Sequence, residues 1–176
     1  VSKAASFMEN ATAVYSSFIE LQDNLNRQVV KAVKEINSIG KQIHELNRQI
    51  TKIETGGVEK ANDLRDKRDL LLDQLAGYGN ISYEEQPNSI VTVRFNCNDF
   101  VTQNGAFEMG MLIDEDTGYA NPYWTQNVRY STDEKGNKIA DYSSAKVFDL
   151  TEEISSKRDT DVGSLRALLL ARGDHA

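Results

Sequence analysis

The strongest constraint on this chain is a series of apolar residues that alternates spacings of three and four from Val1 to Ile53. Apart from Gln22 every position of the series is apolar, which is the heptad pattern of a helix with a packing seam. No proline precedes Pro87 and Gly40 is the only glycine within the series, so nothing obliges the helix to end early. One continuous helix of this length would measure about 80 Å, which predicts a rod, a shape typical of assemblies. The series is Val1, Ala4, Met8, Ala11, Tyr15, Phe18, Gln22, Leu25, Val29, Ala32, Ile36, Ile39, Ile43, Leu46, Ile50 and Ile53.

A second, shorter helix follows. Gly56 and Gly57 are expected to break the first helix, and a glycine near 77–79 suits a C-terminal cap of the next one. Folding back about the glycine pair predicts an antiparallel helical hairpin. The second seam consists of Ala61, Leu64, Arg68, Leu71, Leu75 and Tyr78, and the hairpin would oppose Leu64 to Ile50, Leu71 to Ile43 and Leu75 to Ile39.

The apolar stripe of the first helix is wider in its first half than in its second half. Phe7, Val14 and Leu21 lie one place before the heptad core and Ile19 flanks it, whereas from Asn37 onward the flanks are polar. The first half is therefore expected to contact two neighbouring helices, and the second half only one. The candidate packing and assembly residues are Phe7, Val14, Phe18, Leu21, Ile43, Ile50, Leu64, Arg68, Leu71 and Leu75.

After Asn80 the pattern changes to short segments rich in Ile, Val, Phe and Tyr, separated by turn residues. These segments predict a small antiparallel sheet with one packed face and one wet face, because Val91, Val93 and Phe95 alternate with polar residues. The expected strands are Ile81–Glu85, Ile90–Phe95, Phe107–Ile113, Tyr123–Tyr130 and Lys146–Leu150.

The last part of the chain returns to helix. Thr151–Asp161 has the composition of a linker, and Ser164 is expected to cap a final helix that carries Leu165, Leu168, Leu169 and Arg172. The fold class is therefore α+β, with a helical rod at 1–80, a small β-rich domain at 81–150, and a linker and returning helix at 151–176 that packs on the rod.

Composition excludes several functions. The net charge is −7 and the 20 Lys and Arg residues do not cluster, so no nucleic-acid surface is expected. The longest apolar run, Ala167–Ala171, is too short to insert into a membrane. Cys97 is the only cysteine, which excludes an internal disulfide, and it is interpreted as a small structural residue. Val1 is not an initiator residue, so the chain is expected to be an internal fragment.

Three motifs resemble parts of metal or catalytic sites, but each lacks the other residues that such a site needs. His44 and Glu45 begin like a zinc-protease helix, but Arg48 stands where the second histidine belongs, and the other histidine, His175, is near the end of the chain. Asp114–Gly118 resembles the start of a calcium loop without its later ligands, which favours a plain hairpin turn. Glu84 and Glu85 are adjacent on a predicted strand and so point to opposite faces, which is wrong for an acid and base pair. We therefore expect no enzyme activity, no metal and no cofactor.

Two further groups allow a structural or a binding interpretation. Arg68 is the one cation on the second seam, and pairing with a nearby carboxylate, with Asp63, Asp66 and Asp69 close in sequence, or with a helix-end carbonyl is favoured over ligand binding. Tyr119, Tyr123, Trp124 and Tyr130 could form a binding face, although packing of a small core is the favoured interpretation.

Two helical segments carry a resemblance to a known family. Residues 36–50 read INSIGKQIHELNRQI and residues 61–75 read ANDLRDKRDLLLDQL, and the pair resembles the FlgK family of flagellar hook-associated proteins. Residues 162–169, VGSLRALL, are similar to a helix start of that family, although Arg166 and Ala167 replace two glycines. The resemblance covers about 1–80 and 161–176.

The resemblance implies a structural role without catalysis. Members of this family are exported through the flagellar secretion channel and polymerise outside the cell into the junction between hook and filament. The implied partners are further copies of the chain, the hook protein and the adjacent junction protein, while the fragment alone is expected to be a monomer or to associate weakly.

Two alternatives come from other classes of protein. A coiled-coil adaptor would have the same heptads, but it would continue them through the glycine break into a parallel dimer. A glycan-binding or enzymatic module in the β-rich part would use Trp124 and its neighbouring tyrosines.

Overall fold

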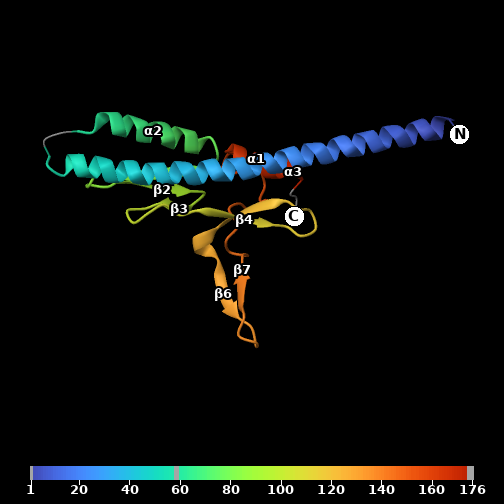
Figure 1. The fold of residues 1–176 in the computed structure, drawn as a ribbon. Helices are drawn as coiled ribbons and strands as arrows, with labels where there is room; N and C mark the ends of the chain where they lie inside the picture. The colour runs from blue at the N-terminus through green and yellow to red at the C-terminus, as the bar shows by residue number, and fades with distance from the viewer. Residues whose placement is uncertain (1, 58–59, 174–176) are drawn as a thin grey trace.

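The computed structural model describes residues 2–57 and 60–173, and it is built on one long helix. Helix α1 runs from Ser2 to Glu54 without interruption, as the heptad series predicts, and Val1 lies outside the described residues. Figure 1 shows α1 as a rod that extends well past the remainder of the molecule at its N-terminal end.

Helix α2, Asn62–Ala76, returns along α1 and forms the predicted antiparallel hairpin (Figure 1). Gly57 has a positive φ of 65° in the connection, a conformation that glycine adopts at little cost. Gly77 caps the end of α2, but in a right-handed conformation rather than the left-handed one typical of glycine caps.

The β-rich part comprises three small antiparallel sheets instead of the single predicted sheet. In each of these sheets the paired strands are consecutive in the sequence, so each sheet is formed by hairpin connections without a crossover. The sheets are β1 (Ile81–Glu85), β2 (Val91–Phe95) and β3 (Asn98–Val101); β4 (Met109–Ile113) and β5 (Ala120–Trp124); and β6 (Arg129–Thr132) and β7 (Lys138–Asp141).

Two strand predictions are wrong and two strands were not predicted. Tyr123–Tyr130 is divided among the end of β5, a 3-10 turn at Thr125–Asn127 and the start of β6. Lys146–Leu150 forms no strand and pairs only through the isolated bridge between Tyr123 and Lys146. Strands β3 and β7 lie outside all the predicted strands. The predicted alternation in β2 is confirmed, since Val91, Val93 and Phe95 are buried.

Helix α3, Ser164–Arg172, follows α2 along the rod. Its first backbone N–H groups, of Ser164 and Leu165, donate to the carbonyls of Gly77 and Tyr78 at the end of α2. The predicted Ser164 cap is wrong: Gly163 occupies the N-cap position, and the Ser164 hydroxyl donates to the Gly77 carbonyl. Gly163 is required there, because a Cβ atom would lie 2.4 Å from the Cα of Gly79 and its φ is 96°.

A single hydrophobic cluster connects the rod, the first two sheets and α3, and none of its residues comes from β6 or β7. Its centre is aromatic: Phe95 makes edge contacts with Phe100, Trp124 and Phe148 at centroid distances of 6.2 to 6.5 Å. Gly40 allows this cluster to reach α1, because a Cβ atom there would lie 2.5 Å from the Phe100 ring. The core therefore spans all three predicted segments, and their division into domains stays a prediction.

Candidate assembly surface

The N-terminal half of α1 carries large apolar side chains that nothing in the described structure covers. Every side chain from Lys3 to Leu21 is exposed, and Phe7 and Val14 have exposed fractions of 71% and 70%. Contiguous exposed apolar surface of this kind marks an interaction site. The exposed set is Phe7, Met8, Val14, Tyr15, Phe18, Ile19 and Leu21, and we call it the N-terminal apolar face.

The N-terminal apolar face is wider than the face of α1 that is buried further along the helix. The row of every seventh residue from Phe7 is apolar through Val14 and Leu21, and then becomes polar at Gln28, Glu35 and Gln42. The Tyr78 hydroxyl donates to Glu35, so this row borders the α2 and α3 side of the rod. An additional apolar row on the helix-facing side is what packing against a further helix requires.

The edge of the α1 seam that lies across from the Phe7 row faces the sheets. Every seventh residue from Ile19 gives Asn26, Val33, Gly40 and Asn47, and three of these four contact β segments. In the N-terminal half the same row supplies only Ala5, Thr12 and Ile19. The N-terminal apolar face is therefore suited to helices rather than to a continuation of the sheet layer.

Asparagine side chains join the rod to the sheets. The Asn37 amide donates to the Met109 carbonyl and accepts from the Met109 N–H, both at 2.9 Å. The Asn47 amide does the same with Val91, at 2.8 and 3.1 Å. Each side-chain amide thus takes the place of a peptide group on a neighbouring strand and satisfies the N–H and the carbonyl of one strand residue. Sequence reasoning missed this role, although both asparagines lie within the family-like segment 36–50.

Arg68 is buried, with an exposed fraction of 1%, and it is held by groups from three elements. It donates to Asn47 Oδ1 at 3.0 Å and to the Ser89 carbonyl at 2.7 Å, and its guanidinium lies 3.6 Å from Glu85. Burial lowers the pKa of Arg68, and the nearby charge of Glu85 opposes that shift. The prediction of structural pairing is supported, but the partners come from α1, β1 and the β1–β2 turn rather than from the aspartates of α2.

An ion-pair network closes the far end of the hairpin. Both Glu54 carboxylate oxygens accept from Arg65, at 2.8 and 2.7 Å, and they also accept from the Ser89 hydroxyl and the Ala61 N–H. These hydrogen bonds, that from Arg65 first, hold the pKa of Glu54 far below its ordinary value, and the same pair raises the pKa of Arg65. Arg65 also contacts Glu85 at 2.8 Å, so the network joins α1, α2 and the first sheet.

A second arginine fixes α3 to the rod. Arg172 is fully buried and donates to Asn26 Oδ1 at 2.6 Å, to the Ala120 carbonyl at 3.1 Å and to Asn121 Oδ1 at 2.8 Å. Its guanidinium also lies 4.6 Å from the centre of the Tyr119 ring. Gln22 donates to the Arg172 carbonyl, so the covered part of α1 begins at about this residue.

The remaining hairpin candidates differ in burial. Ile43, Ile50 and Leu75 are fully buried, whereas Leu64 and Leu71 are half-buried. Leu72, which the predicted seam omits, is buried as well. The seam of α2 is thus rotated slightly toward Leu72, and the predicted pairing of Leu71 with Ile43 stays untested.

The motifs set aside as chemistry have structural positions. Asp114 Oδ1 accepts from the N–H groups of Asp116 and Thr117, so the segment forms the turn between β4 and β5. Trp124 is fully buried, and it therefore offers no platform for a ligand. Among the described residues no group of His, Cys, Asp and Glu is arranged to hold a metal ion, and His175 lies outside them.

Comparison with known proteins gives consistent matches. Residues 1–174 match the family model described as the flagellar hook-associated protein FlgK helical domain. The chain is 27% identical over 115 residues to flagellar hook-associated protein 1 of Bacillus subtilis (strain 168), an alignment that covers 64% of this chain and 22% of that protein.

A solved structure gives the same fold. The flagellar hook junction protein FlgK from Burkholderia pseudomallei superposes with a TM-score of 0.64 at 21% identity, over 91% of this chain and 25% of that one. The chain thus spans about a quarter of the length of the proteins it matches. No helix within residues 2–57 and 60–173 is both long and apolar enough to cross a membrane.

Proposed function

This chain belongs to the FlgK family of flagellar hook-associated proteins, and on that premise we propose that its rod is an assembly element of the hook–filament junction. The observation that carries the proposal is the N-terminal apolar face, which would be covered by helices from the rest of the protein and from neighbouring subunits. The partners would be further copies of the chain, the hook protein and the adjacent junction protein, outside the cell after export through the flagellar apparatus. The role is structural, and we propose no enzymatic activity.

The alternatives are less well supported. A parallel coiled-coil adaptor requires the heptads to continue through Gly56 and Gly57, where the chain instead turns into an antiparallel hairpin. A glycan-binding module built on Trp124 would need that side chain at the surface, and it is buried in the aromatic centre of the core.

The first prediction tests the assembly role. Val14→Asp in the full-length protein is expected to abolish filament attachment and swimming, because it places an unpaired charge on a surface that assembly buries. In the present chain the same change should be mild, since Val14 is already 70% exposed. Motility assays and electron microscopy of flagella would measure the first effect, and thermal unfolding the second.

Ser16→Asp is the matched control, because Ser16 is exposed on the opposite side of α1. The control variant should swim normally. Normal filaments on cells that carry Val14→Asp would contradict the proposal and would favour a different role for the rod.

A further inference from the structure

A cleft of about 550 Å³ opens on the β-rich part of the molecule, between the β4–β5 hairpin, the segment 142–151 and the end of α3. None of the residues that line it belongs to α1, so it is separate from the N-terminal apolar face. Its volume is in the range of sites that hold a ligand or a few side chains of a partner.

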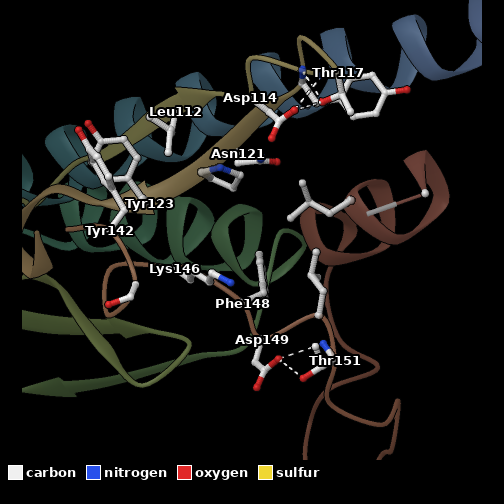
Figure 2. Close-up of a pocket in the computed structure, with 16 residues that line it drawn as sticks. Leu112, Asp114, Thr117, Asn121, Tyr123, Tyr142, Lys146, Phe148, Asp149 and Thr151 are labelled. Carbon is white, nitrogen blue, oxygen red and sulfur yellow. Dashed lines mark hydrogen bonds between the residues drawn. The ribbon is translucent and has the colours of Figure 1, made fainter. Parts of the chain in front are cut away.

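The interior of the cleft is mainly apolar. Pro122, Phe148 and Leu169 line it together with Leu112 and Leu150. Figure 2 shows Phe148 and Lys146 pointing into the space below Asn121, with Tyr123 and Tyr142 at one end. The rings of Tyr123 and Tyr142 meet edge to face, with their centroids 4.8 Å apart. Because of this contact the two rings block that end of the cleft, and neither presents an open face for stacking.

The rim of the cleft is acidic on two sides. Asp114 lies on one side and Asp149 on the other (Figure 2). Each carboxylate accepts hydrogen bonds from a threonine hydroxyl and N–H, of Thr117 and Thr151 respectively, and these bonds lower the pKa of both groups. Both are therefore ionised at neutral pH. Further exposed acids follow on both loops, at 115–116 and 152–153.

An apolar cleft with an acidic rim has the composition of a protein-binding surface rather than of a small-molecule site. Ile154, on the loop after the second acidic segment, is 60% exposed and adds a large apolar side chain to that loop.

We propose that this cleft binds an extended segment of a partner protein in which a large apolar side chain lies beside a lysine or arginine. The apolar side chain fills the space above Phe148 and Leu169, and the cation lies between the loops that carry Asp114 and Asp149. Among the described residues that line the cleft Lys146 is the one cation, and because its charge acts on Asp149, we expect the cation of the partner nearer to Asp114 than to Asp149. This partner would be additional to those that cover the rod.

The experiment is a titration of the isotope-labelled chain, followed by NMR, with a nine-residue peptide of alternating lysine and leucine. Shifts are expected to concentrate at the backbone amides of Leu112, Asn121 and Phe148. Peptides with serine in place of leucine, or with glutamate in place of lysine, should bind at least tenfold more weakly. Higher salt should weaken binding, because the charged rim is exposed.

Matched variants separate this site from the general attraction of a basic peptide to an acidic protein. Asp114→Asn with Asp149→Asn removes two charges and keeps the oxygen that accepts each turn hydrogen bond, and it should weaken binding at least tenfold. Glu9→Gln with Glu20→Gln removes the same charge from exposed positions of α1 and should leave binding unchanged.

Four results would overturn the proposal: equal weakening by the two double variants, shifts centred outside the cleft, stronger perturbation of the same amides by cellohexaose, or concentration-dependent shifts there without peptide. The third result would assign a saccharide site, and the fourth a contact between copies of the chain.

Discussion

At the scale of single residues, the most informative groups are buried polar side chains on a helix that the heptad pattern describes as apolar. Asn47 is almost fully buried and bonds the backbone of Val91 and the guanidinium of Arg68 at once. Apolar periodicity predicted which face of α1 is buried, but it could not predict these contacts, because their partners lie on strands distant in sequence. The available signal was asparagine recurring beside the seam at 26, 37 and 47.

Asn47→Ala is expected to lower the free energy of unfolding by about 2 to 4 kcal/mol, because it leaves the Val91 N–H and carbonyl and one donor of Arg68 without their partner in a buried place. Urea denaturation measures the change. Asn24→Ala is the matched control on the same helix, since Asn24 is exposed and its side chain accepts a hydrogen bond from the exposed Gln28, and it should cost less than about 0.5 kcal/mol. Similar losses for the two variants would contradict the role given to Asn47.

Leu75→Ala tests the packing of the hairpin. Leu75 is fully buried, so the change should lower the free energy of unfolding by about 2 to 5 kcal/mol through lost burial and a residual cavity. Leu71→Ala should cost less, because Leu71 is half-buried, and Leu70→Ala, at a position 58% exposed, should cost less than about 0.5 kcal/mol. An inverted order in chemical denaturation would show that α2 presents a different face to α1.

At the scale of elements, the helices were predictable and the strands only in part. A 53-residue helix repeats its signal many times, whereas the strands have four or five residues each. Strand β3 was missed because it begins with Asn98 and Asp99, two residues that are uncommon in strands. Strand β7 was missed because it has only two apolar residues, Ile139 and Ala140, between Lys138 and Asp141. Strand β5 contains Pro122, which argues against a strand from sequence alone and is tolerated here in a two-stranded sheet.

The network at the turn end of the hairpin predicts a dependence of stability on pH. The pKa of Glu54 is lower in the folded chain than its ordinary value of 4.5, so its contribution is complete above that value and is lost as the pH falls below it. Glu54→Gln should therefore lower Tm at pH 7, and the difference from the unmodified chain should shrink below about pH 4.

Thermal unfolding followed by circular dichroism between pH 3 and pH 7 measures this difference. Glu9→Gln, on the exposed half of α1, is the control and should leave Tm at pH 7 unchanged. A difference between Glu54→Gln and the unmodified chain that is as large at pH 3 as at pH 7 would show that the substitution acts through packing rather than through charge, because the charge contribution must already be reduced at pH 3.

At the scale of the whole molecule, the shape follows from the one long helix. Its 53 residues correspond to about 80 Å, whereas a compact domain of this chain length would have a radius of gyration of about 16 Å. Small-angle scattering should give a clearly larger radius of gyration and a monomer mass at low concentration. A tight dimer would favour the adaptor alternative, and a compact particle would contradict the extended helix.

The contact between α2 and α3 has a consequence for the order in which the chain folds. The Ser164 hydroxyl and the Gly77 carbonyl that it bonds are 87 residues apart, and the intervening chain forms all three sheets. Hairpin formation by α1 and α2 needs only local loop closure, whereas the contact of α3 with the end of α2 closes a loop of 87 residues. We expect that contact to form after the sheets have packed on α1 and shortened the loop. Helix α3 should thus be the slowest of the three helices to gain protection from hydrogen exchange during refolding, and the rate of that step should be set by sheet formation rather than by helix formation.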